Sequence, residues 1–432
     1  MKWVVVGAGS AGCVVARRLA DAGHGVTLIE CGPALEAGTV PPAIDGDDAL
    51  LALAVPGRTH TDLRARRTAG SAATNYWRGR GVGGSSAVNG MVARWGSDDL
   101  YRSWGWGDVD SLRRRVLTPI EQPTSGELGR LDRLLLDASP GASIAPLTRR
   151  SGRRITSAEA YLWPVADRVQ TRTDEVVDRV LLDESGAATG VRLADGDDVF
   201  ADRVVLCAGA IHTPAILLRS GIGAGVGVGL ADHPAAGLVL ELRDTGGAGG
   251  LITAVTIEAD SIQTTPLNHL GPGSRDDLAM LSVALLDPTA RSGTVRLASD
   301  DPSVHPTVDL DLLSSTDDVD RLAEAVGRTI ELVTEGPVAD AVDTVYIDDA
   351  GTGLETLAEP SALRSWLNRS ASGYVHAACS CADAVGDHGD VLGHQALSVA
   401  DASVFPRIPD ANLQLPVTLL AEHFVSAWIE QG

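Results

Sequence analysis

Apolar residues near the start of the chain follow a pattern that is typical of one βαβ unit. Residues 3–6 form a continuous apolar run, as in a strand that is buried on both faces of a parallel sheet. A glycine-rich turn follows, residues 13–22 have helical spacing up to Gly23, and residues 26–29 form a second apolar run. The pattern therefore predicts a strand, a helix and a second strand within about thirty residues.

The remaining chain contains further strand and helix patterns. Residues 188–206 alternate and then become apolar, which predicts a strand followed by a helix whose first turn contains Pro214. From 236 to about 300, apolar and polar residues alternate in segments that are separated by Gly and Pro. This pattern predicts a separate antiparallel sheet. Helical spacing over 316–334 and 415–429 predicts two more helices.

Composition narrows the class of protein. The chain has 432 residues, 44% of them hydrophobic and 21% charged, which predicts a globular protein of roughly two to three domains. Its 57 acidic and 35 basic residues give a net charge of −22. Nucleic acids and anionic membranes require basic surfaces, so we expect neither as the main partner. Lys2 is the only lysine, which excludes a Walker loop elsewhere.

The cysteine content favours a reducing compartment, and the hydropathy favours a protein without a membrane segment. The cysteines are few and scattered, which is not typical of a disulfide framework. We find no apolar run with the length of a signal peptide or of a membrane span. We therefore expect a cytoplasmic protein without an integral membrane segment. The cysteines are Cys13, Cys31, Cys207, Cys379 and Cys381.

A glycine motif lies between the first predicted strand and helix. GAGSAG at 7–12 matches GxGxxG, whose glycines permit a tight turn, close approach of a pyrophosphate and close helix packing. The phosphates would lie at the helix N-terminus, where free N–H groups and the dipole favour anions. Glu30 ends the second strand, where an acid binds the adenosine ribose and repels a 2′-phosphate, which favours FAD or NAD over NADP. The predicted contacts are Gly7, Gly9, Ser10, Ala11, Gly12 and Glu30.

Four later segments extend this pattern. They are RGRGVGGSSAVNGM at 78–91, GAIHTPAILLRSGIG at 209–223, VGVGLADHP at 226–234, and a C-terminal series that begins with VADASVFP at 399–406. Together with the N-terminal motif, they resemble the signature segments of the glucose-methanol-choline (GMC) flavoenzymes, in the order in which that family carries them.

The resemblance implies an α/β fold in which a Rossmann-like FAD-binding domain is interleaved with an α+β substrate domain built on an antiparallel sheet. At 432 residues the chain is compact for this family, which implies a reduced substrate domain. The implied flavin-domain parts are 1–115, 151–235 and 386–432, with a connecting segment at 116–150 and the substrate domain at 236–385.

The resemblance also implies further contacts to FAD. Because lysine is scarce, Arg80 is a candidate for binding the pyrophosphate. Some relatives attach the flavin covalently through a His at the position of Val88, so we expect non-covalent FAD here. The remaining contacts are Gly83, Gly84, Ser85 and Asn89 beside the pyrophosphate and flavin ring, Val177 beside the adenine, and Asp401 and Ala402 near the ribityl chain.

Two residues match the catalytic positions of the family. His376 lies 25 residues before Asp401, and imidazole suits a base that takes an alcohol proton near neutral pH. Asn412 matches the second position, where its amide would orient the substrate oxygen. The loop after His376 departs from the family pattern. Its Cys379 and Cys381 would make a poor tetrahedral ligand set with His376, so we expect no metal.

The implied reaction is oxidation of the CH–OH group of a small-molecule alcohol, with His376 as base and hydride transfer to flavin N5. Oxygen, a quinone or another carrier would then accept the electrons. Two other classes remain open: a lyase on this scaffold, such as a hydroxynitrile lyase, and a non-catalytic flavin-binding partner. The compact plan is also similar to mycofactocin-linked GMC dehydrogenases. His212 and His233, which lie in signature segments, are interpreted as structural residues.

Overall fold

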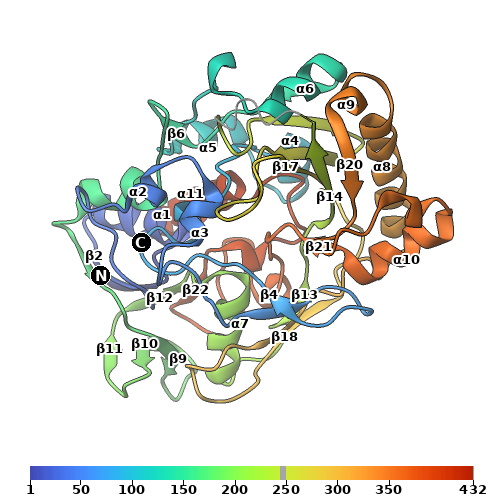
Figure 1. The fold of residues 1–432 in the computed structure, drawn as a ribbon. Helices are drawn as coiled ribbons and strands as arrows, with labels where there is room; N and C mark the ends of the chain where they lie inside the picture. Colours follow the sequence, from blue (N-terminus) through green and yellow to red (C-terminus); the bar gives the residue numbers. More distant parts are fainter. Residues whose placement is uncertain (244–249, 432) are drawn as a thin grey trace.

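The computed structural model describes residues 1–243 and 250–431 (Figure 1). Residues 244–249 and 432, which belong to the predicted segments 236–385 and 386–432, lie outside the described residues. The fold is α/β, as predicted, and contains a parallel sheet, a large antiparallel sheet and smaller sheets between them. None of the helices in the described ranges combines the length and the apolar character that crossing a bilayer requires.

A five-stranded parallel sheet forms the first layer. Its strand order is β22-β12-β1-β2-β8, so its strands come from three distant parts of the chain. The strands at the centre are buried on both faces, which is why residues 3–6 form an uninterrupted apolar run. The strands are β1 (Lys2–Val6), β2 (Gly25–Ile29), β8 (Val169–Arg172), β12 (Arg203–Leu206) and β22 (Leu397–Val399).

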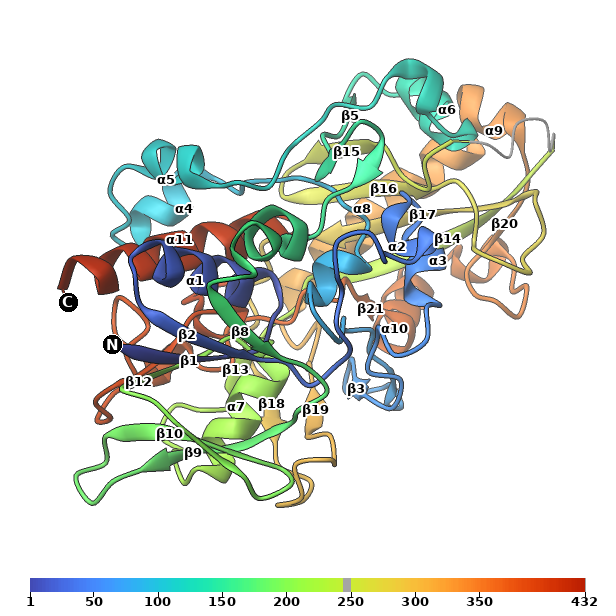
Figure 2. The ribbon, with the colours of Figure 1, turned by 90° about the vertical axis from the view of Figure 1, so that its left-hand side faces the viewer.

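Two helices from opposite ends of the chain cover this sheet side by side (Figure 2). They are α1 (Ser10–Asp21) and α11 (Gln414–Gln431), close to the predicted helices. An ion pair joins them, with Arg18 Nη2 2.8 Å from Oε1 of the fully buried Glu422. The C-terminal helix is therefore fixed against the N-terminal βαβ unit, and its first turn can contribute to the same site.

The large sheet is antiparallel, with the strand order β20-β14-β17-β16-β15-β5 and β21 paired to β14. Alternate residues of β14 are buried on the face against which α8 (Thr316–Thr334) packs, with α9 (Gly336–Ala341) and α10 (Pro360–Ser370) beside it (Figure 1). The strands are β5 (Ala142–Ile144), β14 (Pro234–Leu242), β15 (Val255–Ala259), β16 (Ile262–Leu267), β17 (Leu278–Leu285), β20 (Val342–Tyr346) and β21 (Ser372–Gly373).

Smaller elements connect these layers. Three strands, β9 (Val177–Leu182), β10 (Ala188–Leu193) and β11 (Asp198–Phe200), form one sheet, and β3 (Arg64–Arg66), β4 (Thr74–Asn75), β13 (Val228–Leu230), β18 (Gly293–Arg296) and β19 (Thr307–Asp309) form another. A hairpin pairs β6 (Arg149–Arg150) with β7 (Arg153–Arg154). The short helices are α2 (Pro42–Asp45), α3 (Ala49–Leu53), α4 (Asp98–Ser103), α5 (Val109–Arg115) and α6 (Arg130–Ala138).

The helix after β12 begins earlier than predicted. Helix α7 spans Gly209–Arg219, so Pro214 lies in its second turn and the predicted first-turn position was wrong. A proline at this position cannot donate a hydrogen bond to the carbonyl four residues earlier, which belongs to Ala210. The hydroxyl of Ser380 donates to that carbonyl at 2.6 Å and satisfies it. A contact from a distant loop thus permits the proline inside the helix.

Two glycines of the N-terminal motif allow close packing. Gly7 has φ +98°, and a Cβ there would lie 2.6 Å from the carbonyl oxygen of Cys207. A Cβ on Gly12 would lie only 1.8 Å from the carbonyl oxygen of Gly7. Any side chain at Gly12 would therefore push α1 away from the turn that precedes it.

The substitution Gly12→Ala tests this packing. We expect it to lower the free energy of unfolding by about 1–3 kcal/mol, because the added methyl group overpacks a rigid backbone contact. The matched control is Gly327→Ala in α8, where a new Cβ meets no atom within 4 Å. That change should be neutral or stabilise by roughly 0.5–1 kcal/mol. Urea midpoints measure both, and equal midpoints would contradict the packing argument.

Candidate active site

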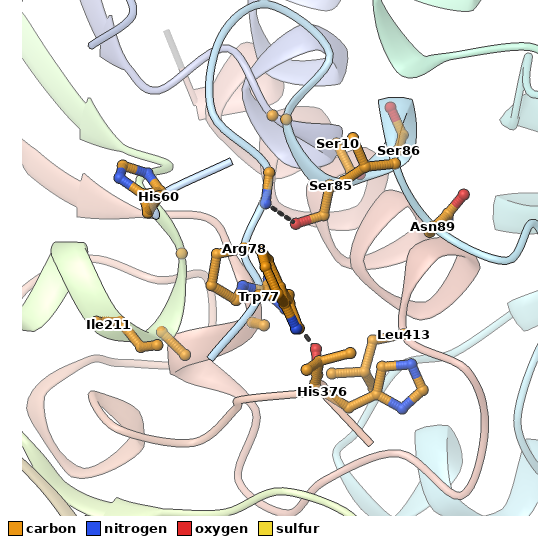
Figure 3. Close-up of a pocket in the computed structure, with 18 of the residues that line it drawn as sticks. Ser10, His60, Trp77, Arg78, Ser85, Ser86, Asn89, Ile211, His376 and Leu413 are labelled. Atoms are coloured by element: carbon orange, nitrogen blue, oxygen red, sulfur yellow. Dashed lines mark hydrogen bonds between the residues drawn. The ribbon is translucent and has the colours of Figure 1, made fainter. Parts of the chain in front are cut away.

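A cavity of about 610 Å³ lies where the parallel sheet, the antiparallel sheet and the start of α11 meet (Figure 3). This volume is in the range of ligand sites in proteins. Most residues predicted as contacts line it, whereas Gly12, Gly83 and Arg80 do not. The lining ones are Gly7, Gly9, Ser10, Ala11, Glu30, Gly84, Ser85, Asn89, Val177, His376, Asp401, Ala402 and Asn412.

The N-terminus of α1 forms one end of the cavity. Its N-cap is Gly9, no side chain caps it, and its first turn contains no acidic residue. The second glycine segment lies against it, since a Cβ on Gly84 would be 2.7 Å from the Cα of Gly9. Free N–H groups and the positive end of the helix dipole therefore border the cavity. This is an environment that stabilises a bound anion such as a pyrophosphate.

Glu30 holds the two glycine segments together. Its Oε2 accepts the backbone N–H of Ala8 at 2.8 Å, and its Oε1 accepts those of Gly32 and Gly81, both at 2.9 Å. A carboxylate oxygen can accept two hydrogen bonds, so Oε2 retains one acceptor site on the cavity side of a buried residue. Binding of a ribose hydroxyl by Glu30 stays a prediction that this geometry accommodates.

Arg78 lines the cavity, as Arg219 does, whereas Arg80 does not. Arg80 donates to the carbonyl oxygens of Cys31 at 2.7 Å and Gly57 at 3.4 Å, and does not itself line the cavity. Arg78 donates to the carbonyl oxygen of Val375, next to the predicted base (Figure 3). The geometry therefore gives no support to the predicted role of Arg80 at the pyrophosphate and places a fixed positive charge near His376.

The start of α11 forms the opposite wall. Gln414 lines the cavity, and its Oε1 accepts a hydrogen bond from the side chain of Asn89. Its Nε2 is buried and has no hydrogen-bond partner among the described residues. An unpaired buried N–H costs about 1–3 kcal/mol, so this donor indicates a ligand acceptor at this place.

Asp401 connects the cavity to α7. Its Oδ2 accepts the N–H of Gly209 at 2.8 Å and the hydroxyl of Thr213 at 2.6 Å, and its Oδ1 accepts the N–H of Ser403 at 2.8 Å. Burial raises the pKa of Asp401, while these hydrogen bonds oppose the rise. The carboxylate thus fixes the first turn of α7 beside the cavity.

The buried carboxylate of Asp232 positions the predicted base. Its Oδ1 accepts the backbone N–H of His233 at 2.8 Å and that of His376 at 2.9 Å. Its Oδ2 accepts the hydroxyl of Tyr76 at 2.6 Å, and that hydroxyl accepts the N–H of Ala377 at 3.0 Å. One carboxylate thus holds the backbones of two histidines that are 143 positions apart in the chain.

The hydrogen bonds of these two histidines determine their tautomers. His233 Nε2 lies 2.9 Å from the carbonyl oxygen of Pro409, which can only accept, so Nε2 carries the proton. The Nδ1 of neutral His233 is then an acceptor, and it lies 2.9 Å from Nδ1 of His376. His376 therefore carries its proton on Nδ1. Its Nε2 keeps a free lone pair, as a general base at the cavity wall requires.

The pKa of His376 lies well below its usual value, mainly because the ring is buried and further because His233 and Arg78 are close. A base with a lowered pKa stays neutral at physiological pH, so its lone pair is available. Asn412 also lines the cavity, and its side-chain oxygen lies 3.4 Å from Nε2 of Gln263. Among the described residues, the Asn412 NH₂ group has no hydrogen-bond partner, so it can donate to a substrate oxygen.

The unusual loop after His376 is firmly anchored. The N–H groups of Cys379 and Cys381 donate to the carbonyl oxygens of Ala402 at 2.9 Å and Ser403 at 2.7 Å. Burial raises the pKa of both thiols to about 12, so neither is a favourable metal ligand. These hydrogen bonds hold the loop after His376 against residues 402 and 403.

The structure adds site residues that sequence reasoning missed. His233 was interpreted as structural, yet it fixes the tautomer of His376. Arg78 and Gln414 lie inside segments that match the family, but the sequence does not show that their side chains point into the cavity. His60 lies outside the matched segments and also lines the cavity.

Two GMC oxidoreductase family models match the chain, one over residues 137–235 and the other over residues 288–421. Together these ranges cover more than half of the chain.

Several curated proteins align over nearly the whole chain. An uncharacterized GMC-type oxidoreductase of Rhodococcus erythropolis is 29% identical over 97% of this chain and 96% of its own length. A 5-(hydroxymethyl)furfural oxidase of Methylovorus sp. is 29% identical over 100% of this chain and 99% of its own length, and an oxygen-dependent choline dehydrogenase of Xanthomonas campestris is 27% identical over 98% and 94%. The Methylovorus alignment spans 527 positions against 432 residues here, so that relative carries insertions that this chain lacks.

Solved structures share the fold. Pyridoxine 4-oxidase from Mesorbium loti superposes with a TM-score of 0.87 at 23% identity, over 99% of each chain. A formate oxidase variant from Aspergillus oryzae superposes with a TM-score of 0.85 at 19% identity, over 99% of this chain and 98% of its own.

The tautomer of His376 can be measured directly. In protein with ¹⁵N-labelled histidine, long-range ¹H–¹⁵N spectra should show His376 protonated at Nδ1 and neutral at pH 6, because its pKa is lowered. His233→Leu removes the acceptor and should release His376 from this tautomer. The control is His394→Leu, since His394 contacts Gly186 away from the cavity. A proton on Nε2 of His376 in the unaltered protein would contradict the assignment.

Proposed function

Since this chain belongs to the GMC oxidoreductase family, we propose that it is an alcohol-oxidising flavoenzyme with non-covalently bound FAD and with His376 as its base. The observation that carries the proposal is the hydrogen-bonded pair of His233 and His376, which leaves one basic nitrogen free at the wall of a dinucleotide-type cavity. Family membership supports the class of reaction, and the geometry supports the identity of the base.

Features of the cavity fit FAD. The glycine turn and the uncapped N-terminus of α1 suit a pyrophosphate, and the free acceptor site on Glu30 suits a ribose hydroxyl. The unpaired Nε2 of Gln414 and the positive end of α11 suit a flavin carbonyl oxygen at the other end. FAD, when bound there, would supply the hydride acceptor for alcohol oxidation.

The protein itself would handle the proton and the substrate oxygen. His376 Nε2 takes the hydroxyl proton, and Nδ1 keeps its hydrogen bond to His233 throughout. The amide of Asn412 donates to the oxygen from which the proton departs and holds the carbinol carbon in place. Arg78 stabilises the developing negative charge on that oxygen through its fixed positive charge. The alcohol thus loses one proton and one hydride and leaves as a carbonyl compound.

We propose a small, neutral alcohol as the substrate class. Apolar and aromatic side chains such as Leu413, Met280 and Tyr374 line the cavity around His376. Within the described residues, the carboxylates of the lining are Glu30, Glu175 and Asp401, which lie on the glycine-turn and α7 sides. Among the described residues, no carboxylate of the cavity lining therefore lies beside His376 to neutralise a cationic substrate. The electron acceptor would be oxygen, a quinone or another carrier.

The variant His376→Ala tests the base. With any alcohol that bleaches the flavin anaerobically, the variant should reduce its flavin about 10²–10⁴-fold more slowly, the usual contribution of a general base. Stopped-flow absorbance measures this rate. His394→Ala is the matched control and should reduce flavin at the unaltered rate.

The same experiment separates the other classes of function. An FAD-containing lyase would convert its substrate without flavin bleaching, and a non-catalytic flavin-binding protein would show neither conversion nor bleaching. Unchanged reduction by His376→Ala would reject the assignment of the base while leaving alcohol oxidation intact. Reoxidation of bleached protein by air or by quinone dyes identifies the class of acceptor.

The position of Val88 predicts how the cofactor is held. Val88 lines the cavity where some members of the family carry a flavin-linked His, and a valine side chain cannot form that bond. Acid precipitation of the yellow protein should therefore release all flavin absorbance to the supernatant and leave a colourless pellet. Flavin retained in the denatured pellet would show a covalent link at another residue.

A further inference from the structure

We propose that His60, His212 and His305 bind one divalent transition-metal ion, Zn²⁺ first among them, at the edge of the cofactor cavity. The three histidines come from separate segments. His60 precedes β3, His212 lies in the first turn of α7, and His305 lies in the loop between β18 and β19. His60 is on the side of the cavity away from His376 (Figure 3).

The ring nitrogens are close enough to share an ion. One nitrogen from each histidine lies within 4.8 Å of the other two, and His212 Nε2 is 3.2 Å from His305 Nδ1. Tetrahedral zinc with Zn–N bonds of about 2.0–2.1 Å separates its ligand nitrogens by about 3.4 Å. The pair His212 and His305 already has this spacing. His60 is half-buried, and its nitrogen, which is within 4.8 Å of the other two, would have to reach the same distance when the ion binds.

The chemical state of the rings suits a metal ligand. Imidazole binds a metal in its neutral form, through a ring nitrogen that carries no proton. Arg78, Arg80 and Arg219 lie near the three rings and oppose a cation, whereas Asp62 near His305 favours one. The net cost is limited because imidazole binds the ion through directed bonds and not through charge alone.

The donor set indicates the class of metal. Three imidazoles favour zinc, cobalt, nickel or copper over magnesium and calcium, which prefer oxygen ligands. With three protein ligands, a tetrahedral ion keeps a fourth position for water. In the absence of metal, one of these two nitrogens carries the proton of the hydrogen bond between His212 and His305, so metal binding requires that ring to adopt its other neutral tautomer.

The ion would link three chain segments at the edge of the cavity. His60 and His212 line the cavity, and so do Pro302, Val304 and Pro306 of the loop that carries His305, although His305 itself does not. One ion on all three would tie that loop and the segment before β3 to α7. We expect bound metal to slow the loss of FAD. This consequence rests on the proposed function, but metal binding itself does not.

Metal binding is tested on the purified yellow holoenzyme. After chelator treatment and desalting, addition of Zn²⁺ should give one zinc per chain by elemental analysis. Co²⁺ in its place should give tetrahedral d–d bands at longer wavelength than the flavin. His305→Gln removes one ligand from a surface loop. It should lower the zinc affinity by more than about 10- to 100-fold, which is the loss expected for a residue that only hydrogen-bonds to a ligand. His305→Cys retains a ligand atom and should restore binding.

The control is His423→Gln, which removes a histidine outside the cluster. This variant should still bind one zinc per chain. Equal binding by His305→Gln and unaltered protein would overturn the site, as would the absence of stoichiometric metal from both. If the protein bound metal only after FAD removal, the proposed link between these segments in the holoenzyme would be wrong. Flavin absorbance is recorded separately, so failure of the FAD proposal is distinguishable from failure of the metal site.

Discussion

A buried carboxylate that accepts backbone N–H groups from distant segments is the interaction on which this site depends. Glu30 joins the two glycine segments, Asp401 joins the last parallel strand to α7, and Asp232 joins the two histidines. Burying a charge is costly unless hydrogen bonds compensate it, and each of these groups accepts three or more. Each carboxylate therefore requires the surrounding backbone to adopt one arrangement, which is the arrangement that shapes the cavity.

The catalytic geometry follows from this constraint. Because Asp232 fixes the backbones of His233 and His376, their rings meet at 2.9 Å and the carbonyl of Pro409 determines the tautomer of both. Val375, the residue before His376, has φ +54°, a strained value for a β-branched residue, and its carbonyl accepts a hydrogen bond from Arg78. Local strain is thus maintained by several contacts that also hold the base in place.

The buried carboxylates and the glycine contacts leave the rest of the chain free to differ in sequence and in loop length. The fold is shared with pyridoxine 4-oxidase at 23% identity, and curated relatives with insertions align over nearly their whole length. Glycine contacts such as that of Gly12 with Gly7 leave no room for a side chain, whereas surface loops tolerate length changes at low entropic cost. A compact chain can therefore keep the cavity while the segments around it shorten.

The sequence by itself determined the βαβ unit, the antiparallel sheet, α8 and the family, because these depend on local periodicity and on motifs with fixed spacing. Most of the contacts predicted from the motifs lie in the cavity lining. Domain boundaries stay predictions. Only the tertiary structure decided that Arg78 lines the cavity in place of Arg80, and that Pro214 lies inside α7. The pairing of His233 with His376 and the cluster around His60 also required it, since hydrogen bonds across more than a hundred residues leave no periodic trace in the chain.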